Sequence, residues 1–269
     1  GVTMGIIAQN RFRDSIWRLK KIADSGIAGK VRCVHVNSLW WRGHSYYDLW
    51  WRGTWEKEGG GPTLNHAVHH IDMLNWIQGA LPVEVSSMLA NVMHDNAEVE
   101  DLSFAALRYA DGSVAQVTSS VVHHGEEQGI VLQCEKAKIS APWSCIASVS
   151  MENGFGVRDT KLMDKINAEY EAIPPLKYEG HVGEIENMLS AIENGKRPLI
   201  TGEDGRRTVE LITAIYKAGF EKQTIRLPIH REDAFYSAEG IQKNAIHFHE
   251  KTTSLKNFTT NEINVGNYK

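Results

Sequence analysis

The chain has 269 residues, of which 42% are hydrophobic and 23% charged, and its formal net charge is −4. This length allows one large domain or two small ones, and the composition is that of a globular protein with a sizeable core. Proteins that bind nucleic acid usually cluster Lys and Arg to neutralise phosphates, and no such basic stripe is present. We therefore expect no nucleic-acid partner.

Cysteine content and hydropathy point to a cytoplasmic protein. The three cysteines, Cys33, Cys134 and Cys145, lie far apart and lack CxxC spacing. Such an arrangement predicts neither a disulfide framework nor a zinc site and favours a reducing compartment. No stretch approaches the roughly 20 apolar residues of a membrane helix, and the first residues lack a signal-peptide pattern. No membrane partner is expected.

The N-terminal part begins with a short apolar run, residues 1–8, that is rich in β-branched side chains and predicts a buried strand. Between residues 14 and 25 apolar side chains recur at helical spacing, and Gly26 suits a left-handed helix exit. Residues 31–39 mix valines with polar residues, as expected of a strand that is covered on at least one face.

The next segment, residues 40–61, has no clear period and ends in three glycines. It holds five of the eight tryptophans, which predicts a flat aromatic surface of the kind that holds sugar rings or nicotinamide. A helix is predicted over residues 62–78. On it, Asn65, His69 and Asp72 are spaced by four and three residues and would share one face.

In the rest of the chain, apolar and polar residues first alternate, as in strands, and then recur at helical spacing. Asp111-Gly112 predicts a tight turn between two of the strands, and the tail after residue 228 is polar and irregular. The predicted fold class is α+β, with a large, mostly antiparallel open β-sheet and helices on one face. Strands are expected over residues 83–92, 102–109, 113–122, 129–134, 144–151 and 225–228, and helices over 179–194 and 203–218.

Five segments, in order along the chain, resemble the Gfo/Idh/MocA oxidoreductases, a family that includes glucose-fructose oxidoreductase and inositol dehydrogenase. The segments are Gln9-Asn-Arg-Phe12, Ser25-Gly-Ile-Ala-Gly-Lys-Val31, Trp51-Arg-Gly-Thr-Trp55, Gly59-Gly-Gly-Pro-Thr-Leu-Asn-His-Ala-Val-His-His-Ile-Asp72 and Gly183-Glu-Ile-Glu-Asn-Met-Leu-Ser-Ala-Ile-Glu-Asn-Gly-Lys-Arg-Pro198.

The resemblance implies that part of the family architecture is missing from this sequence. Members carry an N-terminal Rossmann domain for NAD or NADP, with a glycine fingerprint and a Glu-Lys-Pro motif. Here the GxG at Gly154-Phe-Gly156 lacks the third glycine and the following helix. By resemblance, residues 1–12 are the last strand of a Rossmann domain. Residues 13–269 are then the substrate-binding, catalytic and oligomerisation domain, which in the family is dihydrodipicolinate-reductase-like.

The activity that the resemblance implies is NAD(P)-dependent hydride transfer from a sugar, inositol or glycoside hydroxyl, with no turnover expected from this chain alone. The implied partners are a small sugar or polyol and a second copy, as a homodimer or homotetramer through the sheet face. Two alternatives remain: a non-catalytic binding or oligomerisation module, and an NAD-dependent lyase or glycosidase variant.

His69 is the predicted catalytic base, because alcohol oxidation needs an acceptor for the hydroxyl proton and imidazole titrates near neutrality. It matches the family's histidine, whereas Asn65 stands where many relatives carry aspartate and can hydrogen-bond a hydroxyl without taking its proton. A hydrogen-bonded core histidine is the alternative. We predict no metal site, because His66 and Asp72 face different sides and no HExxH is present.

The remaining predicted site residues carry weaker signals. The resemblance places Trp51 and Arg52 near the nicotinamide, with core packing as the alternative. Each substrate-binding candidate has a structural alternative. It is an ion pair at the domain boundary for Arg11, a solvated loop for Arg42, Tyr46 and Tyr47, and a helix cap for His181. These candidates are Arg11, Arg42, Tyr46, Tyr47 and His181.

Overall fold

A computed structural model of the chain describes residues 2–260 and 262 and is built on one nine-stranded sheet. In pairing order the strands are β8 (Gly156–Arg158), β7 (Ser144–Ser150), β6 (Ala137–Ala141), β5 (Val122–Cys134), β1 (Val31–Trp41), β4 (Val114–Ser120), β3 (Leu102–Arg108), β2 (Glu84–Ala90) and β9 (Ile225–Arg226). Strand β1 is parallel to β4, and the other neighbouring pairs are antiparallel.

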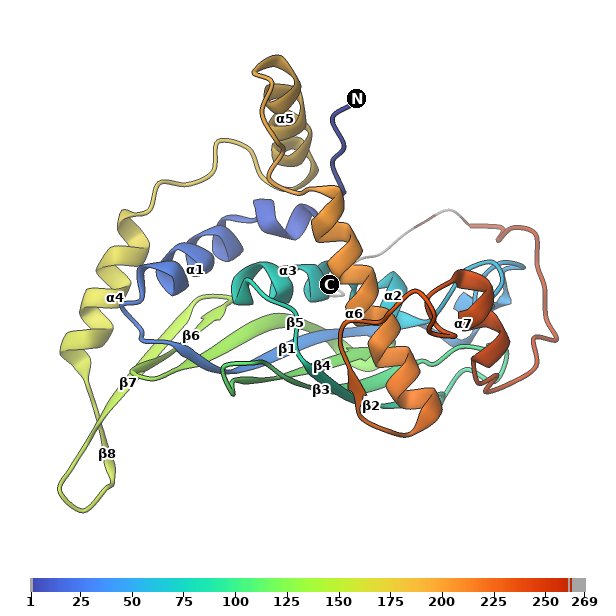
Figure 1. The fold of residues 1–269 in the computed structure, drawn as a ribbon, viewed down its shortest axis with the longest axis horizontal. Coiled ribbons are helices and arrows are strands. Elements are labelled where there is room, and N and C mark those ends of the chain that lie inside the picture. Colours follow the sequence, from blue (N-terminus) through green and yellow to red (C-terminus); the bar gives the residue numbers. More distant parts are fainter. Residues whose placement is uncertain (1, 261, 263–269) are drawn as a thin grey trace.

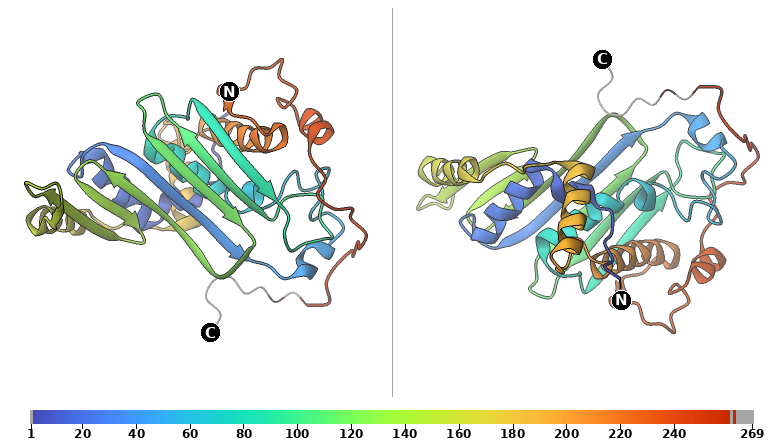
Figure 2. Two further views of the ribbon diagram at one scale, coloured as in Figure 1. Left: turned by 90° about the horizontal axis from the view of Figure 1, so that it is seen from below. Right: turned by 90° about the horizontal axis from the view of Figure 1, so that it is seen from above.

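The long helices lie together on one face of this sheet, and no described element covers the opposite face (Figures 1 and 2). The predicted α+β class with a mostly antiparallel open sheet is confirmed. Helix α5 stands away from the sheet beside the N-terminal segment (Figure 1). The helices are η1 (Gln9–Phe12), α1 (Asp14–Ser25), η2 (His44–Asp48), α2 (Pro62–Asn65), α3 (Val68–Gln78), α4 (Thr160–Ala172), α5 (Gly180–Glu193), α6 (Gly202–Glu221) and α7 (Ala238–Asn244).

The hydrophobic core lies between the helices and the inner face of the sheet. On β1, Val34 and Val36 are fully buried while His35 between them is exposed, as expected of a strand with one covered face. From the helices, Leu19 of α1 and Leu74 of α3 are also fully buried. Each such side chain stabilises the fold by about 1.5–3 kcal/mol.

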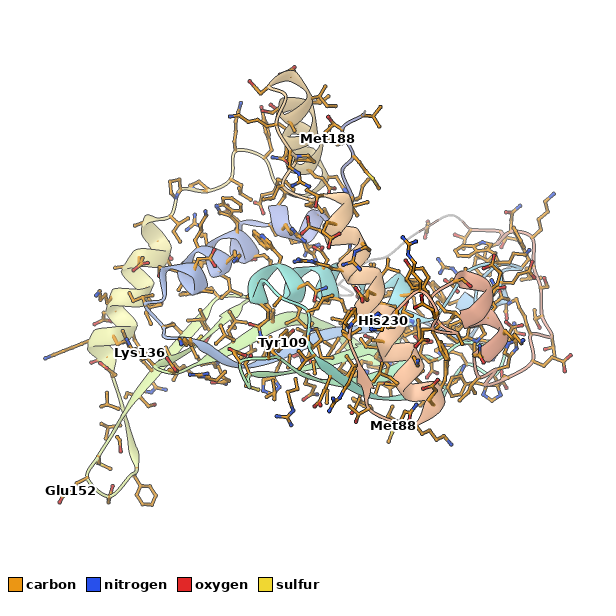
Figure 3. All side chains as sticks on the ribbon, in the orientation of Figure 1. Met88, Tyr109, Lys136, Glu152, Met188 and His230 are labelled. Atoms are coloured by element: carbon orange, nitrogen blue, oxygen red, sulfur yellow. The ribbon has the colours of Figure 1, made fainter. Side chains whose placement is uncertain are left out.

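The uncovered face of the sheet is mixed in character. Met88 on β2 and Phe104 on β3 pair across the two strands and are 68% and 44% exposed, and Met88 projects from the open side (Figure 3). Between β7 and β8 a hairpin projects from the end of the sheet, with Glu152 at its tip (Figure 3). Assembly through the open face remains a prediction.

Local signals at the ends of elements explain several of the observed bounds. Helix α1 ends where Gly26 adopts the left-handed conformation with φ of 71°. Helix α6 begins with a capping box between Thr201 and Asp204. Between β3 and β4 the side chain of Asp111 accepts a hydrogen bond from the Ser113 N–H, which stabilises the predicted turn.

Residues 2–8 do not form the predicted strand. Their only β contact is an isolated bridge from Gly5 to Thr201, and Val2, Met4 and Ile7 are each more than 60% exposed. A strand requires neighbours for its N–H and C=O groups, and no described strand lies beside this segment. The assignment of residues 1–12 to a Rossmann domain stays a prediction.

Four elements have weak sequence signals and were not predicted: β6, β8, α4 and α7. In α4 the signal is weak because only Ile166 and Tyr170 are buried. Strands β6 and β8 are short, at five and three residues, so neither shows a period of its own. Both form because a longer neighbouring strand offers backbone partners.

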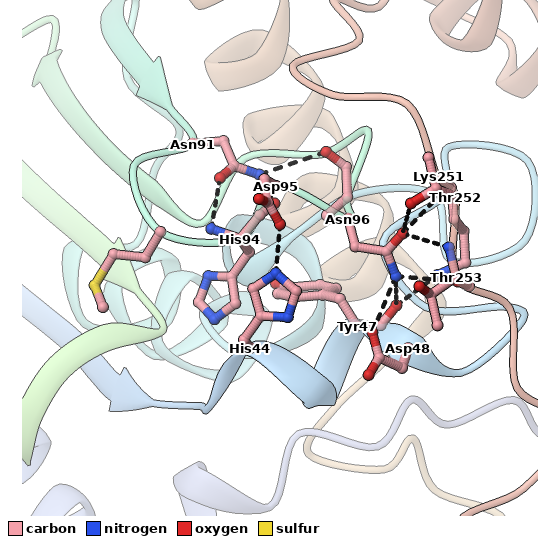
Figure 4. A network of polar contacts seen from close by, with 12 residues as sticks. His44, Tyr47, Asp48, Asn91, His94, Asp95, Asn96, Lys251, Thr252 and Thr253 are labelled. Carbon is pink, nitrogen blue, oxygen red and sulfur yellow. Dashed lines mark hydrogen bonds and ion pairs between the residues drawn. The ribbon is translucent and has the colours of Figure 1, made fainter.

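The C-terminal tail is irregular, as expected, yet it is fastened to the core. The buried side chain of Asn96 accepts hydrogen bonds from the N–H groups of Thr252 and Thr253 and donates to the carbonyl oxygen of Tyr47 (Figure 4). The ammonium of Lys251 donates to the same Tyr47 oxygen. One asparagine thus joins the tail to the tryptophan-rich segment.

The triple glycine permits a close contact with a buried acid. Glu100 is fully buried, and its carboxylate accepts from the N–H groups of Gly61 (3.2 Å) and Thr63 (3.1 Å) and from the Tyr216 hydroxyl (3.0 Å). A Cβ on Gly61 would lie 1.9 Å from the Glu100 carbonyl oxygen, and one on Gly60 would lie 2.2 Å from the Tyr216 hydroxyl. These positions exclude side chains on steric grounds.

We therefore expect Gly61→Ala to destabilise the protein by about 3 kcal/mol or more, because its methyl group overlaps backbone that cannot move freely. Urea unfolding followed by tryptophan fluorescence measures the change. Gly156→Ala is the matched control, since its Cβ meets nothing closer than 3.6 Å, and it should cost less than about 1 kcal/mol. Equal effects of the two substitutions would contradict this role of the triple glycine.

Candidate functional site

The side chains predicted for catalysis diverge at a wide turn between α2 and α3. The N–H groups of His66 and Ala67 both bond to the Pro62 carbonyl oxygen, at 3.2 and 2.8 Å, and the second bond spans five residues. A closure of this π type interrupts the regular helix and is common at functional sites. The continuous helix predicted through this segment is wrong here, and Asn65 and His69 point to different partners.

His69 is half-buried and lies among ionisable groups at the start of α3. Burial lowers its pKa, and the charges of His181 and Arg13 lower it further while that of Asp72 opposes them. Its Nδ1 is buried and has no hydrogen-bond partner among the described residues. Because an unpaired buried polar atom is costly, such atoms in native proteins call for an explanation. A ligand or a water molecule that His69 binds would supply one.

Arg11 is almost fully buried and is occupied by acidic side chains. Its guanidinium donates two 2.7 Å hydrogen bonds to the Asp72 carboxylate and a 3.1 Å bond to Asp204. It also lies over the ring of Trp76, 5.5 Å from the centroid. Burial raises the pKa of Asp72, and the contact with Arg11 opposes that shift. The structure favours an ion pair at the domain boundary over substrate binding by Arg11.

Arg11→Met should cost about 3–5 kcal/mol of stability, because it leaves Asp72 buried without its cation. Arg32→Met is the control: its pair with Glu135 is exposed on both sides and should contribute less than about 1 kcal/mol. Chemical denaturation of both variants makes the comparison. Similar losses of stability in the two variants would show that the buried ion pair contributes no more than the exposed one.

The tryptophan-rich segment forms what we call the aromatic–arginine patch: Trp40, Arg42, Tyr46, Trp51 and Arg52. The Arg52 guanidinium lies 3.9 Å above the Tyr46 ring and 4.2 Å above that of Trp51. Arg42 lies 5.4 Å from the Trp40 ring centroid and 5.7 Å from that of Tyr46. All five residues are half-buried, so flat rings and cationic donors share one partly accessible surface.

A chain of hydrogen bonds joins this patch to the wide turn. The buried carboxylate of Glu58 accepts from Arg52 Nη1 at 3.0 Å, from the Gly53 N–H at 2.6 Å and from Asn65 Nδ2 at 2.8 Å. The other end of the amide, Asn65 Oδ1, contacts His66 Nδ1. Burial raises the pKa of Glu58, and these three donors oppose the shift. The sequence pattern did not single out Glu58, whose one signal is an acid directly before the triple glycine.

Two further predicted binding residues differ in access. Tyr47 is fully buried and packs edge-on against the ring of His94, with 4.9 Å between the two ring centroids. It is therefore part of the core that supports the site, and it does not face a ligand. His181 is 64% exposed in the first turn of α5, with Nδ1 3.6 Å from the Glu184 carboxylate. The structure therefore brings His181 near His69 and keeps Tyr47 in the core.

Two histidines of this region have strongly depressed pKa values. Burial is the main cause for both: it lowers the pKa of His66 to about 3 and that of His70 to about 4, from an ordinary value of 6.5. Below pH 6.5 the unfolded chain therefore binds protons that the folded chain does not. Above pH 6.5 neither state binds these protons, and the two histidines do not lower the free energy of unfolding. As the pH falls from 6.5 to about 4, the free energy of unfolding decreases.

We expect His70→Gln to remove about 3 kcal/mol of the stability loss that the unmodified protein shows between pH 6.5 and pH 4. Free energies of unfolding at several pH values in this window measure the slope. His247→Gln, at an exposed position in the tail, is the comparison variant. A slope that is the same in the His70 variant would contradict the neutral, buried state of this ring.

The described residues do not fit a dinucleotide site. Gly154 lies in the turn of the β7–β8 hairpin, where its N–H bonds to the Met151 carbonyl oxygen, and Gly156 begins β8. A pyrophosphate cradle needs a strand-to-helix turn instead. The face of Trp51 beneath Arg52 is also already covered.

The described part of the chain contains neither a metal-binding cluster nor a membrane-spanning helix. No three His, Cys, Asp or Glu side chains there are grouped in a way that could hold a metal ion. Among the helices described, none has both the length and the apolar character required to cross a bilayer.

Residues 16–140 match the family model described as the GFO/IDH/MocA C-terminal domain. The match covers a little less than half of the chain. The sequence is 24% identical to 2,7-anhydro-N-acetylneuraminate hydratase of Mediterraneibacter gnavus, over 77% of this chain and 62% of that protein. It is 23% identical to myo-inositol 2-dehydrogenase of Thermotoga maritima, over 81% of this chain and 62% of that protein.

Solved structures show the same fold. The WlbA dehydrogenase of Bordetella pertussis, in complex with NADH and UDP-GlcNAcA, superposes with a TM-score of 0.67 at 24% identity, covering 86% of this chain and 65% of that one. The aldose-aldose oxidoreductase of Caulobacter crescentus gives a TM-score of 0.65 at 19% identity, with 84% and 64% covered. The chain spans less than two thirds of the length of each of these relatives.

Proposed function

We propose that this chain carries the sugar-binding and proton-accepting part of an NAD(P)-dependent oxidoreductase that acts on a sugar or polyol hydroxyl. The observation that carries the proposal is His69: a half-buried imidazole with an unpaired buried nitrogen, close to His66 and His181. The relatives, which are sugar and inositol dehydrogenases and a hydratase, support a sugar-modifying family.

The chemistry assigned to this chain is the proton half of alcohol oxidation. Burial and the neighbouring cations keep the His69 ring neutral at physiological pH, so a lone pair is available for the hydroxyl proton. The half-buried ring of Trp40 offers a surface for a sugar ring, and Arg52 can donate to the sugar's oxygens. The acceptor of the hydride is a nicotinamide held elsewhere, because the described residues form no cradle for it.

We also propose where a nucleotide-binding domain would pack. On α5 four aliphatic side chains recur on one stripe and are each more than half exposed, although the helix lies beside the N-terminal segment (Figure 1). Exposed apolar stripes of this kind mark interfaces. The greater length of the relatives supports a further domain as the occupant. The four residues are Val182, Ile185, Leu189 and Ile192.

The proposal predicts a sugar-dependent signal at His69. Titrating the chain with myo-inositol and with UDP-N-acetylglucosaminuronic acid should shift the ring ¹⁵N resonances of His69 saturably, and His69→Gln should lose those resonances. The exposed ring of His247 serves as an internal control and should not move. If neither sugar shifted His69, the proposed function would be wrong. Steady NADH formation by the chain alone would contradict the placement of the cofactor elsewhere.

A second candidate function is addition or removal of water, favoured by the hydratase among the relatives. The two candidates differ in their products, because dehydrogenation changes nicotinamide absorbance permanently whereas hydration does not. Mass analysis of the sugar after reaction, at 18 Da for water against 2 Da for two hydrogens, separates them.

A further inference from the structure

The Glu58–Asn65–His66 chain fixes which nitrogen of His66 carries a proton. Both oxygens of the Glu58 carboxylate face donors, so the Asn65 amide must turn its NH₂ group toward Glu58. The amide oxygen is then the atom that contacts His66 Nδ1. Because that oxygen can only accept, Nδ1 must donate and therefore bears the hydrogen. In the neutral ring this leaves Nε2 as an acceptor.

The Nε2 atom of His66 is available to a ligand. It has no hydrogen-bond partner within residues 2–260 and 262, and it is not among the buried unpaired atoms, unlike Nδ1 of His69 and of His70. The ring lies 5.6 Å from that of Trp40 and 6.2 Å from that of Tyr46. An acceptor with aromatic faces on two sides suits a hydroxyl group on a sugar ring.

The surroundings of His66 also keep it from taking up a proton. Burial lowers its pKa to about 3, and the nearby cations Arg42 and Arg52 act in the same direction. A base that weak does not take the proton of an alcohol in the physiological range. It remains a permanent hydrogen-bond acceptor, whereas His69 is the ring left to accept a proton. The two imidazoles are thereby suited to different tasks.

We propose that His66 is a substrate-positioning residue whose Nε2 accepts a hydrogen bond from a hydroxyl of a sugar that binds at the aromatic–arginine patch. Glu58 and Asn65 act through it by holding the ring in one tautomer. Among the described residues Arg52 hydrogen-bonds Glu58 through Nη1 only, so its other donors can face the acceptor oxygens of the same sugar. This inference rests on the proposed function and names the feature that the site selects: a free hydroxyl donor on the sugar.

The tautomer can be tested without any ligand. Two-bond ¹H–¹⁵N correlation spectra of the full chain should show His66 protonated at Nδ1 and unprotonated at Nε2 between pH 5 and pH 8. In Asn65→Leu the ring loses its acceptor and should shift toward the Nε2-protonated form. Glu58→Gln offers a milder perturbation should the first variant unfold, and His247→Gln should leave the spectrum of His66 unchanged. A wild-type ring protonated at Nε2 overturns the inference.

The ligand contact is tested with myo-inositol as the probe. Saturating myo-inositol should shift His66 Nε2, and His66→Phe, which keeps an aromatic ring without the acceptor, should weaken binding about tenfold. A shift at His69 with none at His66, or unchanged affinity in His66→Phe, overturns this inference and leaves the proposed function standing. Absence of a shift at both histidines overturns both.

Discussion

The carboxylate of Glu100 holds the start of α2, and the geometry of the site depends on it. Two backbone N–H groups and the Tyr216 hydroxyl converge on this buried acid, and the approach is possible because glycines precede the helix. Burial raises the pKa of Glu100 to about 7, and donors from Thr63 and Tyr216 oppose that shift. These hydrogen bonds fix the start of α2. The wide turn that follows therefore has a defined position between the sheet and α6.

From that turn the polar side chains leave in separate directions. Asn65 and His66 face the aromatic–arginine patch, whereas His69 faces α5 and Asp72 enters the interior to meet Arg11. The extra residue in the turn causes this separation, since a regular helix would have aligned three of these residues on one face. The result is a row of imidazoles in environments of different burial, which is a means of giving identical side chains different roles.

Arg11 and Arg52 show how two arginines of one protein differ in their surroundings. Arg11 is enclosed by two carboxylates and an aromatic ring, so it fastens the N-terminal segment to α3 and α6. Arg52 stacks on rings as well, yet it lies at the partly exposed patch and shares one contact with a single acid. Both residues are arginines, so access to solvent, more than residue type, decides which of them can contact a ligand.

The sequence by itself determined the α+β class, most strand positions, both ends of α1 and the start of α6, because these follow from local periodicity and capping residues. The helix predicted to end at residue 218 continues to Glu221. It also predicted that the chemistry lies on the helix after the triple glycine, residues 62–78, and this stays a prediction. Only the tertiary structure decided how those side chains are used. Arg11 and Asp72 lie 61 residues apart, and Glu58 reaches Asn65 across the glycines and not along a helix. Burial and contacts between distant segments set these roles, and no local pattern in the chain encodes them.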